Sequence, residues 1–132
     1  MTPEFLAAVI DTLLPGDDVL PSGTAAGVAL AAAHTAVLEM AAAQAGGMDM
    51  FARAPDSARV AVLQAVERAQ PEPFRALLVA VLSDYHQSAA AIRAVGWRVE
   101  PPQPTGHSIA HSSDATAEQL ERVRQRKKLW RG

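Results

Sequence analysis

Apolar side chains recur at helical spacing along most of the chain, and no stretch alternates strongly enough to predict a strand. The clearest stripe lies in 73–96 and consists of Phe74, Leu77, Leu78, Val81, Leu82 and Tyr85, continued by Ile92. A second stripe in 3–14 consists of Phe5, Leu6, Val9, Ile10 and Leu13. In 56–69 we expect Val60, Leu63 and Val66 to face inward. The pattern predicts an all-α fold, a small bundle of about four main helices.

Residues that favour helix ends bound the first and third of these helices. Thr2 can cap the first helix and Pro3 suits its first position, while the Pro15–Gly16 pair ends it near Leu14. A single helical turn is expected in "MDMFARAP", and Asp56 or Ser57 would then cap a helix that runs to about residue 69.

An alanine-rich stretch predicts a central second helix. We expect it to start at Ser22 or Thr24 and to run to Gln44, where Gly46 and Gly47 end it. Eleven alanines fall in 25–45. Because small side chains allow close approach, neighbouring helices should pack on two sides of this one.

The chain changes character after residue 96. Gly96 suits the position just past the end of the fourth helix, and "WRVEPPQPTGH" after it reads as an extended, proline-rich arm. Asp114 or Thr116 should cap a final basic helix over about 117–130. The sequence therefore predicts a helical core domain, 1–96, and an arm with its C-terminal helix, 97–132.

Charge separates the same two regions. Residues 1–113 hold 11 acids and 6 bases, a balance of −5, whereas 114–132 hold 3 acids and 6 bases, a balance of +3. An acidic core would repel a polyanion, so we expect the basic helix to meet water or an acidic protein surface rather than nucleic acid. The chain has no cysteine, which excludes disulfides, thiolate metal sites and a cysteine nucleophile.

Residue spacing gives little support for chemistry within this chain. The pair His34 and Glu39 is five apart and Asp84 and His86 are two apart, so neither pair shares a helix face, and no Glu-x-x-His pair exists. No glycine-rich phosphate loop is present. We expect no catalytic, cofactor or metal site in this chain. An enzyme that uses Tyr85, Asp84 and His86 is the weaker alternative.

The arm carries the residue types of a protein interface. Trp97 and Trp130 bracket it, and stiff proline-rich segments lose less entropy on docking. The competing interpretation is that Trp97 only covers the protein's own core. The predicted partner-binding residues are Trp97, Pro101, Pro102, Pro104, Gly106, His107, Arg124, Lys127, Trp130 and Arg131.

Two blocks resemble a known family. "FLAAVIDTLLPGDDVLPSGTAAGV" is similar to a family helix followed by a Leu-Pro-Gly-Asp loop and an Ala-Gly-Val entry to a second helix. "FRALLVAVLSDYHQSAAAIRAVGWRVEPPQPTGH" is similar to a late helix with a tyrosine, followed by a Gly-Trp/Tyr…Pro-x-Pro-x-Gly arm. Together they resemble the small (gamma) subunits of the gluconate 2-dehydrogenase subunit 3 family.

The resemblance implies a non-catalytic subunit that binds and stabilises a large flavin-dependent oxidoreductase of the glucose–methanol–choline type. The FAD would belong to that partner, and some complexes of the family add a cytochrome subunit. No membrane span is expected. No twin-arginine or cleavage motif precedes the first helix, which predicts a cytoplasmic protein, or a periplasmic one if an exported partner carries it. The alternative is a helical adaptor or homo-oligomer with a swapped C-terminal arm.

Overall fold

The computed structural model describes residues 1–30, 32–100, 106 and 113–125. The chain divides into two compact units, Met1–Val99 and Glu100–Gly132. The sequence predicts this division after Gly96.

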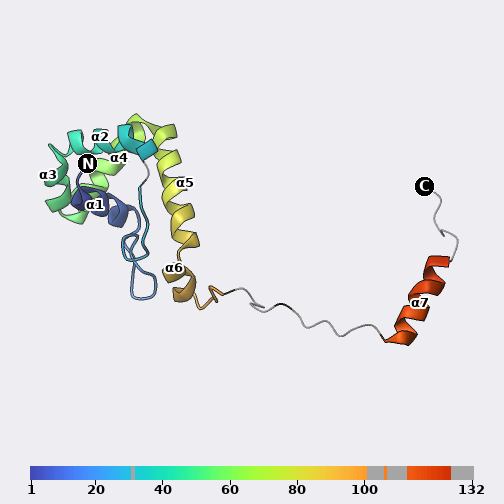
Figure 1. Ribbon diagram of the computed structural model, residues 1–132. Coiled ribbons are helices and arrows are strands. Elements are labelled where there is room, and N and C mark those ends of the chain that lie inside the picture. Colours follow the sequence, from blue (N-terminus) through green and yellow to red (C-terminus); the bar gives the residue numbers. More distant parts are fainter. Residues whose placement is uncertain (31, 101–105, 107–112, 126–132) are drawn as a thin grey trace. The chain divides into compact units, whose positions relative to one another are not determined.

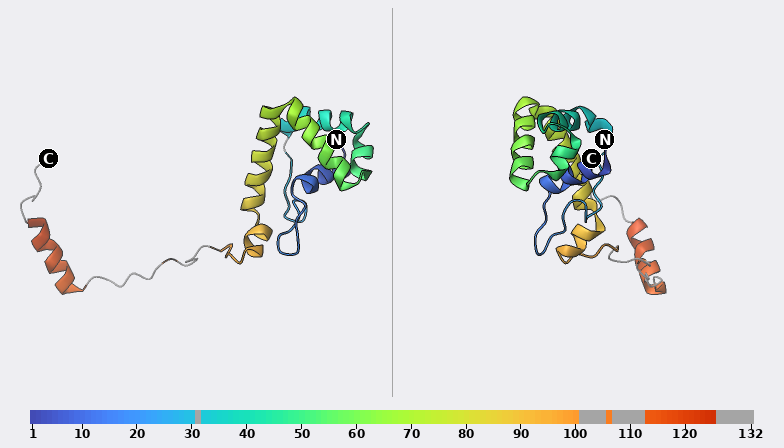
Figure 2. Two further views of the ribbon diagram at one scale, coloured as in Figure 1. Left: turned by 180° about the vertical axis from the view of Figure 1, so that it is seen from behind. Right: turned by 90° about the vertical axis from the view of Figure 1, so that its left-hand side faces the viewer.

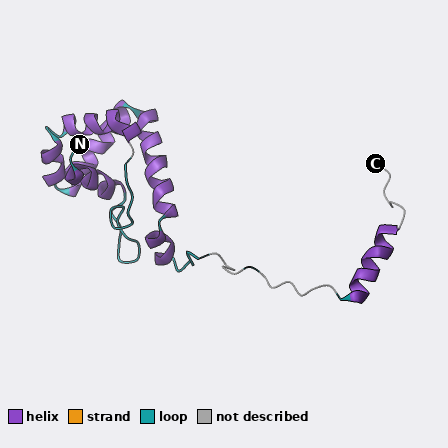
Figure 3. Ribbon diagram, viewed as in Figure 1, coloured by secondary structure: helices purple, strands orange, loops and turns teal. Residues whose placement is uncertain are grey.

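The predicted all-α class is confirmed. The helices of the first unit are α1 (Pro3–Leu13), the 3₁₀ turn η1 (Ala32–His34), α2 (Thr35–Gln44), α3 (Met48–Arg53), α4 (Asp56–Ala69), α5 (Pro71–Gln87) and α6 (Ala89–Ala94) (Figure 1). The second unit holds α7 (Asp114–Gln125). The described ranges contain no strand (Figure 3). None of the helices in them combines the length and apolar character needed to cross a bilayer.

The core of the first unit forms where α1, α3 and α4 meet and where α2 and α5 pack on α4 (Figure 2). Phe5 and Phe51 lie edge to face at its centre, with ring centroids 5.3 Å apart. This is a favoured aromatic geometry. The largest fully buried side chains are Phe5, Phe51, Leu77, Val9, Val66 and Val81.

The predicted stripes of α4 and α5 are largely confirmed. In α5 the buried residues are Phe74, Leu77, Val81 and Tyr85. Leu82, at the edge of that stripe, is 41% exposed. In α4 Leu63 and Val66 are buried, but the prediction for Val60 is wrong, since its side chain is 41% exposed.

The prediction of one long second helix is wrong over about its first half. Residues 23–27 form turns, and α2 begins only at Thr35. Gly27 takes a φ of +83°, which does not fit a right-handed α-helix. Two backbone N–H groups of this segment also donate to carboxylates of other elements. The Thr24 N–H donates to Asp11, and the Ala29 N–H donates to Asp84. The positive φ of Gly27 and the tertiary hydrogen bond of Ala29 thus oppose a helix here, despite the high helix propensity of alanine.

The predicted fourth helix is also interrupted. Ser88 has an extended backbone, with ψ at 136°, and its Oγ accepts the N–H of Ala91 at 3.1 Å. Ser88 is therefore an N-cap, and a serine side chain competes well for backbone groups at such a position. The apolar stripe hides this break because Ala91 and Ile92 keep packing against the same surface.

Several helix ends agree with the sequence. Thr2 Oγ1 accepts the N–H of Phe5 at 3.3 Å, and α3 forms the single predicted turn. At the end of α2, Gly46 and Gly47 donate to the carbonyls of Ala43 and Ala42, which makes a Schellman motif.

Two predicted caps are wrong. The N-cap position of α4 is Pro55, so Asp56 lies in the first turn. In α7 it is Ser113 Oγ that accepts the N–H of Thr116, at 3.3 Å, and the helix therefore starts at Asp114. The predicted continuation of this helix beyond residue 125 lies outside the described residues.

Replacing Gly23 by alanine should destabilise the first unit by about 1–3 kcal/mol, because the new Cβ would lie 2.5 Å from Ile10 Cγ2 and 3.2 Å from Leu14 Cβ. Urea unfolding measures the change, with Ala25→Ser at an exposed position as the control. Equal midpoints for the two variants would contradict the close packing of this loop on α1.

Candidate functional site

The segment between α1 and η1, here called the 14–30 loop, begins with a tight turn. Asp17 Oδ1 accepts the N–H groups of Val19 and Leu20 at 2.8 and 2.7 Å, and the Leu20 carbonyl accepts the N–H of Asp17 at 2.9 Å. Gly16 has a φ of +71°, and a Cβ there would lie 2.5 Å from the backbone nitrogen of Ser22. The "PGDDVL" sequence therefore fixes the direction in which Leu20 points.

A carboxylate of α1 holds the middle of the loop. Asp11 accepts both the backbone N–H of Thr24, at 2.9 Å, and its hydroxyl, at 2.7 Å. Next to this contact Gly23 donates to the Leu14 carbonyl at 2.8 Å. The loop backbone thus lies directly on the C-terminal half of α1.

Two consecutive residues of α5 hold the loop from the other side. The Tyr85 hydroxyl donates to the Pro21 carbonyl at 2.8 Å, and Asp84 Oδ2 accepts the N–H of Ala29 at 3.0 Å. These positions point in different directions on a helix, so they bind the loop at two separate points. The loop is consequently fixed between α1 and α5 by polar side chains, and Tyr85 is buried beneath it.

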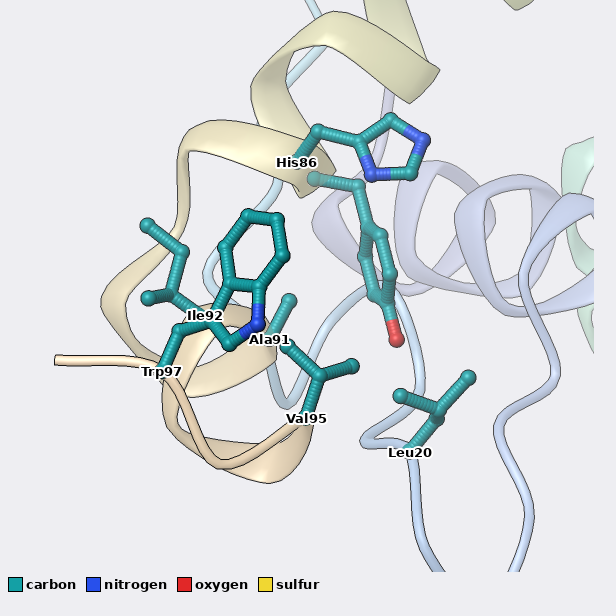
Figure 4. Close-up of a pocket in the computed structure, with 7 residues that line it drawn as sticks. Leu20, His86, Ala91, Ile92, Val95 and Trp97 are labelled. Atoms are coloured by element: carbon teal, nitrogen blue, oxygen red, sulfur yellow. The ribbon is translucent and has the colours of Figure 1, made fainter. Parts of the chain in front are cut away.

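The end of α6 fixes the backbone of Trp97. Gly96, with a φ of +77°, donates to the Arg93 carbonyl at 2.9 Å, and Trp97 donates to the Ile92 carbonyl at 3.1 Å. This is a Schellman motif, which commonly brings the residue after the glycine against the one five positions earlier. Figure 4 shows the indole of Trp97 beside Ile92.

These elements enclose an open, apolar cavity of about 390 Å³, here called the Trp97 pocket, lined by Leu20, Tyr85, His86, Ala91, Ile92, Val95 and Trp97 (Figure 4). Leu20 enters from the 14–30 loop. The remaining residues come from α5, from α6 and its C-cap Val95, and from the position after Gly96. The side chain of Trp97 is nevertheless 73% exposed. The Tyr85 hydroxyl is hydrogen-bonded to the Pro21 carbonyl and is therefore not available to a ligand. The pocket consequently suits an apolar side chain or ring.

Two carboxyl groups of this region have lowered pKa values. Burial of Asp11 raises its pKa, but hydrogen bonds from Thr24 and Ser22 and the charge of Arg59 together outweigh burial. The N–H groups of Leu20 and Val19 lower the pKa of Asp17. Both carboxylates are therefore charged acceptors that stabilise the loop near neutral pH.

The three residues of the alternative enzyme hypothesis have different surroundings in the structure. Tyr85 and His86 line the Trp97 pocket, with their rings edge to face at 6.0 Å, whereas Asp84 binds the backbone of Ala29. In the described part of the chain no three His, Asp or Glu side chains are close enough to share a metal ion.

Three predicted partner-binding residues lie in the described ranges. Trp97 lines the pocket, Gly106 is exposed with a φ of +72°, and Arg124 on α7 is exposed and pairs with Glu121 at 3.7 Å. Trp97 belongs to the first unit, whereas Gly106 and Arg124 belong to the second. The other predicted residues lie outside the described ranges: Pro101, Pro102, Pro104, His107, Lys127, Trp130 and Arg131.

The sequence analysis does not single out three residues that build the pocket, Leu20, Ala91 and Val95. Leu20 was in a segment interpreted only as a loop, and Val95 belonged to no stripe. The available indication was Gly96 followed by tryptophan, since a Schellman end predicts a contact between Trp97 and Ile92.

In comparisons with protein-family models, with curated proteins and with solved structures, no match to this chain was found.

The Asp11→Asn variant should lose stability relative to the natural chain near neutral pH, and the difference should shrink on acidification. The pKa of Asp11 is below its usual 3.8 in the folded state, so its stabilisation is fully present above that value and is lost as pH falls through the folded pKa. Urea unfolding from about pH 6 to pH 2.5 measures it. In a Thr24→Ala background the pH-dependent part of this stability difference should decrease. A stability difference that does not change with pH would contradict this role of Asp11.

The Tyr85→Phe variant should lower the free energy of unfolding by about 1 kcal/mol, because the hydrogen bond to Pro21 is lost while the ring is kept. Backbone exchange of the Leu20 amide should accelerate in the same variant, since that wall of the pocket is released. An unchanged exchange rate would show that the loop's own turn at Asp17 suffices. His86→Phe, which alters the pocket without touching Pro21, is the matched control.

Proposed function

We propose that this protein is a non-catalytic small subunit, which binds and stabilises a large flavin-dependent oxidoreductase of the glucose–methanol–choline type. The proposal starts from the sequence resemblance of two blocks, residues 5–28 and 74–107, to the gluconate 2-dehydrogenase subunit 3 family. In the structure these two blocks supply Leu20 and Trp97, which line one pocket although they are far apart in sequence.

The observation that carries the proposal is the exposed indole of Trp97 beside an apolar pocket. A tryptophan that served only to cover its own core would be mostly buried, whereas this one is 73% exposed on a backbone fixed by a Schellman motif. Its neighbours Val95 and Val99 are exposed as well. Tryptophan is enriched among residues that dominate the energy of protein interfaces.

The proposal assigns different roles to the two proteins. Hydride transfer from a sugar or alcohol to FAD would take place in the partner, and this chain would contribute binding energy. A subunit that binds only the folded partner stabilises it by mass action. An additional cytochrome subunit and a cytoplasmic or periplasmic location remain part of the same proposal, because both would follow from the partner.

The proposed complex is tested by isolating the tagged full chain from its own host cells and examining the proteins that bind to it. A yellow complex with FAD absorbance is expected. Trp97→Ala should weaken binding at least about tenfold, as expected for an interface anchor. Met50→Ala, at an exposed apolar position on α3, should leave it unchanged.

Truncation after Gly96 provides the second arm of this test. The helical core should remain folded by circular dichroism, while the flavoprotein is no longer retained. Retention of the flavoprotein by both the truncated chain and Trp97→Ala would contradict the proposed interface. Absence of any flavoprotein bound to the natural chain would contradict the proposed function itself.

A further inference from the structure

Helix α5 lies at the edge of the first unit and has an outer face that no other helix of that unit covers (Figures 1 and 2). The middle of this outer face consists of Ala76, Val79, Leu82 and Ser83, with Glu72 and Arg75 before it and His86 after it. All seven residues are exposed, Val79 by 57% and Leu82 by 41%.

The middle of this face lacks the charges expected on a solvated helix. No charged residue occurs between Arg75 and Asp84, so the exposed positions there are small or apolar. A helix normally places charged and polar residues opposite its buried stripe. Small residues such as Ala76 and Ser83 also allow another helix to approach closely, at an interaxial distance of about 8 Å.

Polar side chains at the two ends make the face complementary to itself, because the Glu72 carboxylate can accept a hydrogen bond from a His86 imidazole N–H. If two copies of α5 pack antiparallel about a twofold axis at Val79, Glu72 of one copy lies opposite His86 of the other. The same axis places Ala76 opposite Leu82 and Val79 opposite its own counterpart. A parallel pair would instead place Glu72 beside Glu72, which is repulsive. In the described part of the chain neither Glu72 nor His86 has an ion-pair partner.

We propose that the outer face of α5 is a homodimer interface, in which a second copy of this chain packs antiparallel about Val79. The contact is isologous, as in most soluble dimers. It involves one helix from each copy, which is at the small end of specific interfaces, so the expected Kd lies between about 1 µM and 1 mM. Apart from His86 it uses none of the residues of the Trp97 pocket, so it does not rest on the proposed function.

The natural absence of cysteine permits a direct test on the full chain. In the Val79→Cys variant the two thiols lie at the twofold axis, where a disulfide can bridge Cα atoms about 4.4–6.8 Å apart. Mild oxidation should therefore produce a covalent dimer, and its rate should rise with protein concentration.

Two matched variants distinguish cross-linking in the proposed register from cross-linking by random collision. In Arg75→Cys the two cysteines would be eight residues apart along the antiparallel helices, about 12 Å, which is too far for a disulfide. Ala43→Cys places an exposed thiol on α2, away from the interface. Both should cross-link at least about tenfold more slowly than Val79→Cys, if the twofold axis passes through Val79.

Sedimentation of the chain without cysteines provides the second measurement. The natural protein should show a concentration-dependent dimer, and Val79→Glu, which places two carboxylates at the axis, should be monomeric with unchanged circular dichroism. Equal cross-linking of all three cysteine variants, or a natural protein that is monomeric up to about 1 mM, would overturn the proposal. A Val79→Glu variant that still forms the dimer would overturn it as well.

Discussion

The contact between the Asp11 carboxylate and Thr24 determines the path of the 14–30 loop, and the rest of the site depends on that path. One carboxylate accepts both the N–H and the hydroxyl of Thr24. The loop therefore lies on α1 rather than extending α2 by another three turns. With the loop in this position, Pro21 meets the Tyr85 hydroxyl and Leu20 reaches the Trp97 pocket. A polar contact on α1 thus shapes an apolar surface formed mainly by α5 and α6.

Trp97 owes its position to backbone geometry rather than to burial. The Schellman motif at Gly96 fixes its N–H on the Ile92 carbonyl, while the indole keeps most of its surface in contact with water. Such an arrangement orders an anchor before any partner arrives, which lowers the entropic cost of binding. The proposed subunit role would use this preorganisation, with Trp97 as the anchor residue.

The sequence was sufficient for the features that depend on local residues. The all-α class, the cap at Thr2, the glycine end of α2 and the buried stripe of α5 follow from periodicity and end preferences. It failed where distant residues compete with local propensity. The alanines of 25–31 favour a helix, but Gly27 takes a positive φ and Asp84 binds the Ala29 N–H that such a helix would need. The break at Ser88 was missed because the apolar pattern continues through it. The Trp97 pocket could not be predicted, since Leu20 enters it only after the loop is fixed.

Amide hydrogen exchange at Thr24 and Ala29 tests most directly whether distant carboxylates fix the loop. Each N–H donates to a carboxylate of another element, so both should exchange as slowly as the amides in the middle of α1. Exchange of both amides at the rate of an unstructured peptide, with α1 still protected, would contradict the account.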